Sequence, residues 1–150
     1  MIRVQREDFD VGAEIDRLAA GKLGIGGVAS FVGLVRGAAG GEAIGAMTLE
    51  HYPGMTEKLL AEIEAEAQRR WPLEASLVIH RYGRLEPGAR IVLVVTASAH
   101  RQAAFEACEF LVDWLKTKAP FWKLEETAAG PRWVDAQTSD DRAMKRWVAE

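Results

Sequence analysis

Apolar residues recur along this chain with two periods, and the period of each stretch predicts its secondary structure. Alternation over 28–36 is typical of a strand, and Gly33 within it indicates a bulge or a close backbone approach. The segment 91–95 is apolar at every position, which favours a central strand covered on both faces. Strands are predicted at 2–4, 28–36, 43–51, 73–82, 90–97, 121–127 and 132–136. We expect 43–51 to pair antiparallel with 28–36 across the glycine-rich turn 37–41.

Apolar residues spaced three and four apart predict four helices between these strands. The first follows a cap at Asp8 or Asp10 and ends near Gly21, and the second runs from Met55 to about Arg70 before Pro72. A third helix begins near His100 and ends before Pro120, with a core stripe of Phe105, Cys108, Leu111, Val112 and Leu115. A last helix is capped by Ser139 or Asp140 and contacts the core through Met144 and Trp147. This order favours one α+β domain over residues 1–150, built around a mainly antiparallel sheet with packed helices.

Composition and charge narrow the class of protein. The chain has 150 residues, 49% of them hydrophobic, and a formal net charge of −3, which fits one globular domain with a core. We expect a cytoplasmic protein, because the start lacks a signal pattern and no apolar run approaches the ~20 residues of a membrane span. Slight acidity argues against nucleic-acid binding. The single cysteine, Cys108, excludes an intramolecular disulfide, and its place in the helical core stripe makes it a poor nucleophile.

The candidate chemistry is cationic. Arg36 ends a strand, His100 and Arg101 stand where a helix begins, and Lys116 and Lys123 stand near its end and beyond it. A helix start with free N–H groups and an arginine suits an anion. A lysine buried beside Phe121 and Trp122 would have a lowered pKa and could act in acid–base chemistry or as an amine nucleophile. The simpler alternatives are that Arg36 is solvated surface and that the lysines complement the helix dipole.

The three histidines support no strong site. His51, His80 and His100 are widely spread, which makes a weak case for a metal. We expect His80 and Arg81 to be satisfied or surface residues at a strand end.

Four strings then make a specific pattern, in order and at characteristic spacing: FVGLVR at 31–36, LEHYPGMT at 49–56, SAHR at 98–101 and LKTKAPFWK at 115–123. Together they resemble the large, catalytic subunit of molybdopterin synthase. The resemblance implies an α/β-hammerhead fold with a small extra sheet. It also implies transfer of sulfur from the C-terminal Gly-Gly thiocarboxylate of a small ubiquitin-like subunit to cyclic pyranopterin monophosphate. The product is the dithiolene of molybdopterin, in molybdenum cofactor biosynthesis. The implied assembly is a heterotetramer around a homodimer of large subunits, and no cofactor or metal is implied.

The same resemblance assigns roles to residues. Lys116 and Lys123 match the catalytic lysines, and Arg36, His100 and Arg101 match the residues that bind the anionic substrate. A helix of some 16 residues would hold His100 and Lys116 about 25 Å apart. We therefore expect a site shared between subunits, with His100 and Arg101 supplied by the neighbour.

The chain departs from the family pattern in two places. The loop after Arg36 is rich in glycine and alanine, and Val112 stands where methionine is common. The rival functions are a non-catalytic dimeric module for a phosphorylated metabolite, an inactive scaffold subunit, and RNA binding.

Overall fold

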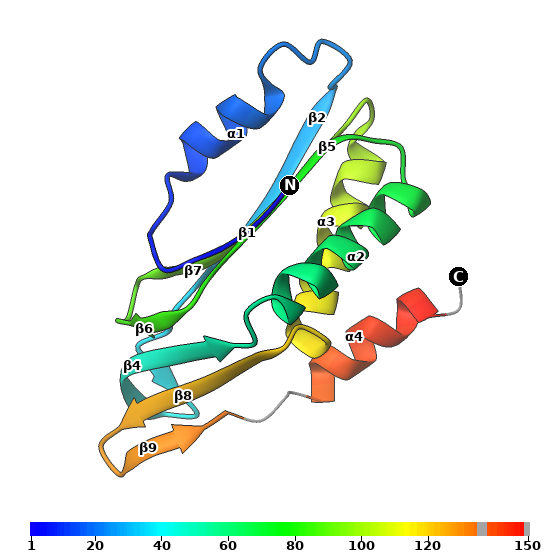
Figure 1. The fold of residues 1–150 in the computed structure, drawn as a ribbon. Helices are drawn as coiled ribbons and strands as arrows, with labels where there is room; N and C mark the ends of the chain where they lie inside the picture. The colour runs from blue at the N-terminus through cyan, green and yellow to red at the C-terminus, as the bar shows by residue number, and fades with distance from the viewer. Residues whose placement is uncertain (135–137, 149–150) are drawn as a thin grey trace.

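Two sheets lie one below the other in the computed structural model, which describes residues 1–134 and 138–148 without the side chains of residues 39 and 138–141 (Figure 1). The larger sheet has the order β1 (Ile2–Gln5), β5 (Leu73–Arg81), β7 (Arg90–Ser98) and β2 (Gly27–Leu34). The smaller has the order β3 (Ala38–Ala39), β4 (Glu42–His51), β8 (Phe121–Thr127) and β9 (Gly130–Trp133), with β6 (Gly83–Leu85) also paired to β4. The helices are α1 (Val11–Ala19), α2 (Met55–Arg70), α3 (Arg101–Thr117) and α4 (Thr138–Val148). β1 is parallel to β5 and the other pairings are antiparallel, which confirms the predicted α+β class.

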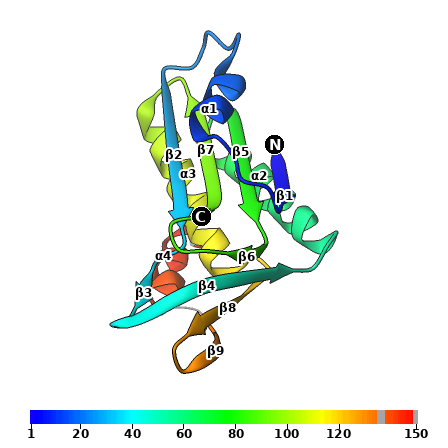
Figure 2. The same ribbon diagram turned by 90° about the vertical axis from the view of Figure 1, so that its left-hand side faces the viewer.

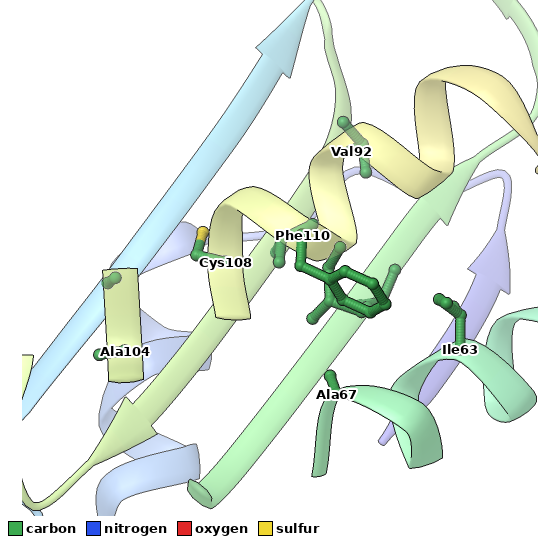
Figure 3. Packing of buried hydrophobic residues seen from close by; sticks show 10 residues of the cluster. Ile63, Ala67, Val92, Ala104, Cys108 and Phe110 are labelled. Carbon is green, nitrogen blue, oxygen red and sulfur yellow. The ribbon is translucent and has the colours of Figure 1, made fainter. Parts of the chain in front are cut away.

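The larger sheet is buried on both faces. Alternate residues of β7 point to opposite sides, so Val92 and Val94 pack toward α2 and α3 while Leu93 and Val95 pack toward α1. Figure 3 shows the first of these clusters, in which Phe110 of α3 lies between the sheet and α2. The prediction of a central strand covered on both faces is therefore confirmed.

Local signals explain where the first two helices begin. Asp10 caps α1, because its Oδ1 accepts a hydrogen bond of 3.0 Å from the Ala13 N–H. At α2 the N-cap is Gly54, with φ of 85°, and its N–H donates to Glu57 Oε2 at 2.7 Å. Only glycine adopts such a φ without strain, which accounts for the Pro-Gly break before α2.

Gly33 lies both at a β-bulge and at a close approach between strands, the two features predicted for a glycine within a strand. The register of β2 with β7 shifts between Gly33 and Leu34, so a bulge is present. A Cβ built on Gly33 would stand 2.7 Å from Val92 Cγ1, so the close approach is to a side chain on the neighbouring strand.

The predicted pairing of 43–51 with 28–36 is wrong. β4 pairs with β8, β6 and β3, whereas β2 pairs with β7 as the edge strand of the larger sheet. The two-residue turn at Gly40 and Gly41, both at positive φ, joins β3 to β4 instead. The chain thus leaves the larger sheet after β2 and enters the smaller one, as Figure 2 shows from the side.

Three smaller predictions also need correction or lie outside the description. Phe105 is 63% exposed, so it does not belong to the core stripe of α3, where Ala104, Ala107 and Phe110 are buried instead. β9 spans Gly130–Trp133, and residues 135 and 136 of the predicted strand lie outside the described residues. α4 starts at Thr138, and the side chains of the proposed caps Ser139 and Asp140 are not described.

Trp147 contacts the core as predicted. Its ring lies 5.5 Å from that of Phe110, and its Nε1–H donates to Asp113 Oδ2 at 2.7 Å. No helix in the described parts of the chain is both long and apolar enough to cross a membrane.

Candidate active site

A small pocket lies where the two sheets and the end of α3 come together. It encloses about 90 Å³ and is walled by β2, β5 and β7 of the larger sheet, by the last turns of α3 and by the start of β8. The lining residues are Phe31, Gly33, Leu34, His80, Ile91, Val92, Val112, Leu115, Lys116, Ala119, Phe121 and Lys123. Three of them carry polar side chains, namely the two lysines and His80, and none carries a carboxylate.

The two lysines reach this pocket from different elements. Lys116 is in the last turn of α3, and Lys123 is on β8 after the chain has turned at Pro120. Both line the same pocket. Lys116 is exposed and Lys123 is half-buried, so neither meets the condition of full burial under which a lowered lysine pKa is expected. Trp122, on the opposite face of β8, is 41% exposed.

His80 is the buried member of the group. It is 5% exposed, its ring stacks on Phe121 at 3.6 Å between centroids, and the planes are 13° apart. Its Nδ1 lies 2.9 Å from the Arg81 carbonyl oxygen, which only accepts hydrogen bonds. The pKa of His80 is lowered to about 3, mainly by burial and also by the nearby Lys123, while the Arg81 bond opposes the shift. His80 is therefore a neutral imidazole near neutral pH.

The string LEHYPGMT holds the start of β8 in place. His51 is the register partner of Phe121, and their ring centroids are 5.9 Å apart. The Thr56 hydroxyl donates to the Tyr52 carbonyl at 2.7 Å, so it accepts from His51 Nδ1 at 3.0 Å. These bonds tie the turn after β4 to the first turn of α2. Phe121 thus lies between His51 and His80, and its position sets that of Lys123 two residues later on the same face.

A carboxylate also lies on the Lys123 face of β8, but it is engaged elsewhere. Glu125 is 6% exposed and accepts from Arg132 at 3.2 Å, and Arg132 donates in turn to Glu42 at 2.8 Å. The guanidinium therefore bridges two strands of the smaller sheet and offsets the charge of Glu125. This pairing leaves the lysine pocket cationic.

The three residues predicted to bind the anionic substrate are not in this pocket. Arg36 is exposed, two residues after Leu34 of the lining, and its neighbour Val35 is fixed by backbone bonds to Ala89 and Gly88 at 2.9 and 2.8 Å. It therefore lies close along the chain to the pocket wall.

His100 and Arg101 are exposed at the far end of α3, whose 17 residues span about 25 Å. Close packing fixes that end. A Cβ on Gly26 would stand 2.1 Å from the Ala99 carbonyl oxygen, and one on Gly27 would stand 3.6 Å from the Cα of Arg101. Gly26, before β2, and Gly27, its first residue, thus leave room for the start of α3. Within one chain, the structure brings Lys116 and Lys123 together in the pocket, whereas His100 and Arg101 lie far from it.

Sequence reasoning missed His80. It was expected to be a satisfied or surface residue, and it does have a backbone partner, but it also lines the lysine pocket. The one local signal is a histidine that ends an apolar run, Leu77–Ile79, in a buried strand.

Cys108 is 7% exposed, and burial raises the pKa of its thiol to about 11, in agreement with its predicted inertness. Among the described residues, no group of three or more His, Cys, Asp or Glu side chains is placed to hold a metal ion.

A family model and curated relatives point to the same protein family. The family model described as "MoaE protein" matches residues 4–118. A Pseudomonas aeruginosa protein named molybdopterin synthase catalytic subunit is 59% identical over 146 residues, which cover 97% of each chain. A protein of the same name from Ralstonia nicotianae is also 59% identical, over 97% of this chain and 83% of its own length.

The fold agrees as well. The solved structure of the molybdopterin biosynthesis MoaE protein from Burkholderia ambifaria has a TM-score of 0.85 and 53% identity, and covers 100% of this chain and 99% of that one. These matches confirm the resemblance that the four sequence strings carry. With its fold and its sequence in agreement, the chain belongs to the MoaE family.

Proposed function

We propose that this chain is the catalytic subunit of a molybdopterin synthase. It would transfer sulfur from the C-terminal thiocarboxylate of a small ubiquitin-like subunit to cyclic pyranopterin monophosphate, which gives the dithiolene of molybdopterin. The observation that carries this proposal is the pocket in which Lys116 and Lys123 lie together without a carboxylate in its lining. The name of the Pseudomonas aeruginosa relative supports it, and the word "subunit" in that name supports a second chain.

The size and charge of the pocket suit the end of an anionic chain. A volume of about 90 Å³ is well below the ~300–1,000 Å³ of sites that enclose a whole small-molecule ligand. It fits a Gly-Gly terminus and the reacting carbon, while the rest of the pterin lies outside. Two anions, a thiocarboxylate and a cyclic phosphate, meet more readily where ammonium groups offset their repulsion. Overall, a carbon–oxygen bond of the substrate is replaced by a carbon–sulfur bond, and the donor is left as a carboxylate.

The lysines divide the work by position. Lys116, exposed at the mouth of the pocket, contacts the thiocarboxylate and takes part in the proton transfers or in a covalent step. Lys123, half-buried, anchors and polarises the pterin-side intermediate. Arg36, His100 and Arg101 bind the phosphate.

A second copy of the chain supplies His100 and Arg101. The length of α3 keeps these residues about 25 Å from Lys116 of their own chain, so they serve a neighbour's pocket. The complete enzyme is then a homodimer with one small subunit at each end, a heterotetramer.

Substitution of the lysines tests the activity. We expect Lys116→Ala and Lys123→Ala each to reduce molybdopterin formation about 100-fold or more, with the thiocarboxylated small subunit as donor. Lys118→Ala is the matched control, because Lys118 is exposed, lies two residues from Lys116 and does not line the pocket. Near-normal turnover in both pocket variants would refute the assignment. A chain that binds the pterin but forms no product would instead be the non-catalytic metabolite module.

Mixing of inactive variants tests the shared site. A dimer of one Lys116→Ala chain and one His100→Ala chain has one site with both residues intact and one with neither. Random exchange of chains should therefore restore roughly a quarter of the wild-type rate from two inactive proteins. No recovery after exchange, with mixed dimers demonstrated by mass spectrometry, would place each site within one chain.

A further inference from the structure

His80 is the one polar side chain in the pocket to which the proposed sulfur transfer gives no role. The other polar lining side chains, Lys116 and Lys123, only donate hydrogen bonds when they are protonated. His80 is therefore the one side chain among the described lining residues that can accept a hydrogen bond from an ammonium group.

The contacts of His80 fix which nitrogen is the acceptor. Nδ1 donates its hydrogen to the Arg81 carbonyl at 2.9 Å, so in the neutral ring Nε2 carries the lone pair. The parallel stack on Phe121, at 3.6 Å, prevents the ring from turning without loss of that contact. The tautomer and the direction of the lone pair are thus both set by the fold.

The surroundings keep this ring uncharged. Its pKa is lowered to about 3, mainly by burial and further by the charges of Lys123 on β8, Lys116 on α3 and His51 on β4, while the Arg81 bond opposes the shift. Its register partners on β1 and β7 are both valines, which carry no charge. A group that stays neutral from about pH 5 upward can accept a hydrogen bond without adding a third cation.

We infer that His80 is a positioning residue whose Nε2 accepts a hydrogen bond from the Lys123 ammonium and holds that cation toward the substrate. Lys123 lies two residues after Phe121 on the same face of β8, and Phe121 is the residue that stacks on His80. A carboxylate in this place would hold the lysine equally well, but it would cancel the charge that an anionic substrate needs. A neutral imidazole orients the ammonium and leaves its charge available to the substrate.

Two amide substitutions separate this role from a structural one. In His80→Asn the short amide can replace Nδ1 as donor to Arg81 but cannot reach the Nε2 position. In His80→Gln the longer amide places an oxygen near Nε2. Both variants lose the ring stack, and only His80→Asn keeps the donor to Arg81, so a purely structural role predicts that His80→Asn is affected no more than His80→Gln.

The first readout is the pKa of Lys123 in the free protein, followed by NMR of its side-chain amine. A hydrogen bond to the charged form raises a pKa, so the Lys123 pKa should fall in His80→Asn and return toward the wild-type value in His80→Gln. Equal Lys123 pKa values in all three proteins would overturn the inference. If neither variant folds, the tautomer of His80 in the unaltered protein tests the inference instead. Nitrogen shifts of His80 must show hydrogen on Nδ1 and none on Nε2 at pH 7, and the opposite tautomer or an imidazolium would overturn it.

The second readout is turnover, and it rests on the proposed function. Loss of a hydrogen bond to a charged group should lower kcat about 10- to 100-fold in His80→Asn, and His80→Gln should recover most of it. Equal turnover in the two variants would overturn the role in catalysis. If the unaltered chain forms no molybdopterin, the proposed function fails, while the NMR comparison still decides whether His80 holds Lys123.

Discussion

Replacement of Gly33 by alanine tests how tightly β2 packs on β7 at the pocket wall. The added Cβ would stand 2.7 Å from Val92 Cγ1, a distance that forces a shift. Val92 is 6% exposed and β-branched, so its methyl groups cannot move aside at low cost. Overpacking of this kind costs about 1–3 kcal/mol. We expect Gly33→Ala to lower the free energy of unfolding by about 2 kcal/mol, which corresponds to about 4–8 °C in Tm for a chain of this length.

A double-mutant cycle isolates the contact. In a Val92→Ala background the nearest of the remaining neighbours would be Phe31 Cε1, at 3.5 Å, which is ordinary van der Waals contact, so Gly33→Ala should cost less than about 0.5 kcal/mol there. Urea unfolding, analysed at constant m, measures each corner of the cycle. Gly12→Ala in α1 is the control, because its Cβ would come no closer than 3.6 Å to Asp10 Oδ1, and it should be neutral or stabilising by up to about 1 kcal/mol. If Gly33→Ala lowers the free energy of unfolding equally in the wild-type and Val92→Ala backgrounds, the steric explanation is refuted.

Two further predictions concern titratable groups. Because burial raises the pKa of the Cys108 thiol to about 11, native protein at pH 8 should resist iodoacetamide and become labelled only on unfolding, as read by mass spectrometry; rapid native labelling would contradict this. The hydrogen bond from Arg90 lowers the pKa of Asp8 from 3.8 to about 2, so the stabilisation by this carboxylate is present above pH 4 and is lost as pH falls toward 2. Asp8→Asn should therefore flatten the loss of Tm between pH 4 and 2 and cost about 1 kcal/mol or less at pH 7, since the pair is partly exposed. Asp16→Asn, at an exposed site with no ion pair among the described residues, should leave the acid profile unchanged, and an equal effect of both would exclude the Arg90 pair as the cause.

The sequence predicted local structure better than pairing. The unbroken apolar run in β7 placed it correctly at the centre of a sheet, because burial on two faces leaves no polar positions. The pairing of β4 was wrong because two partners, β2 and β8, are both plausible from pattern alone. The short turn at Gly40 and Gly41 rules out β2 as the partner, because it joins β4 to β3 and pairs those two strands instead. Contacts between distant segments leave little trace in a single sequence.

The core of α3 shows a similar limit. Phe105 was placed inside because it is large and apolar, yet the helix meets the sheet through Ala104 and Ala107, whose small side chains allow close approach. The paired lysines could be predicted because they lie in one continuous string. The place of His80 beside them depends on four strands and a helix, so the sequence alone did not predict it.

The walls of the lysine pocket come from both sheets, so the pocket stays intact only while both sheets are folded. The larger sheet holds the main clusters on its two faces, whereas the smaller sheet is anchored by a modest cluster of Val35, Leu49 and Leu85. Segments with little buried apolar contact open more often than the whole molecule unfolds. Opening of β8 would carry Lys123 away from Lys116 while the larger sheet stays folded. We therefore expect local opening of the smaller sheet, ahead of global unfolding, to limit the lifetime of an intact site.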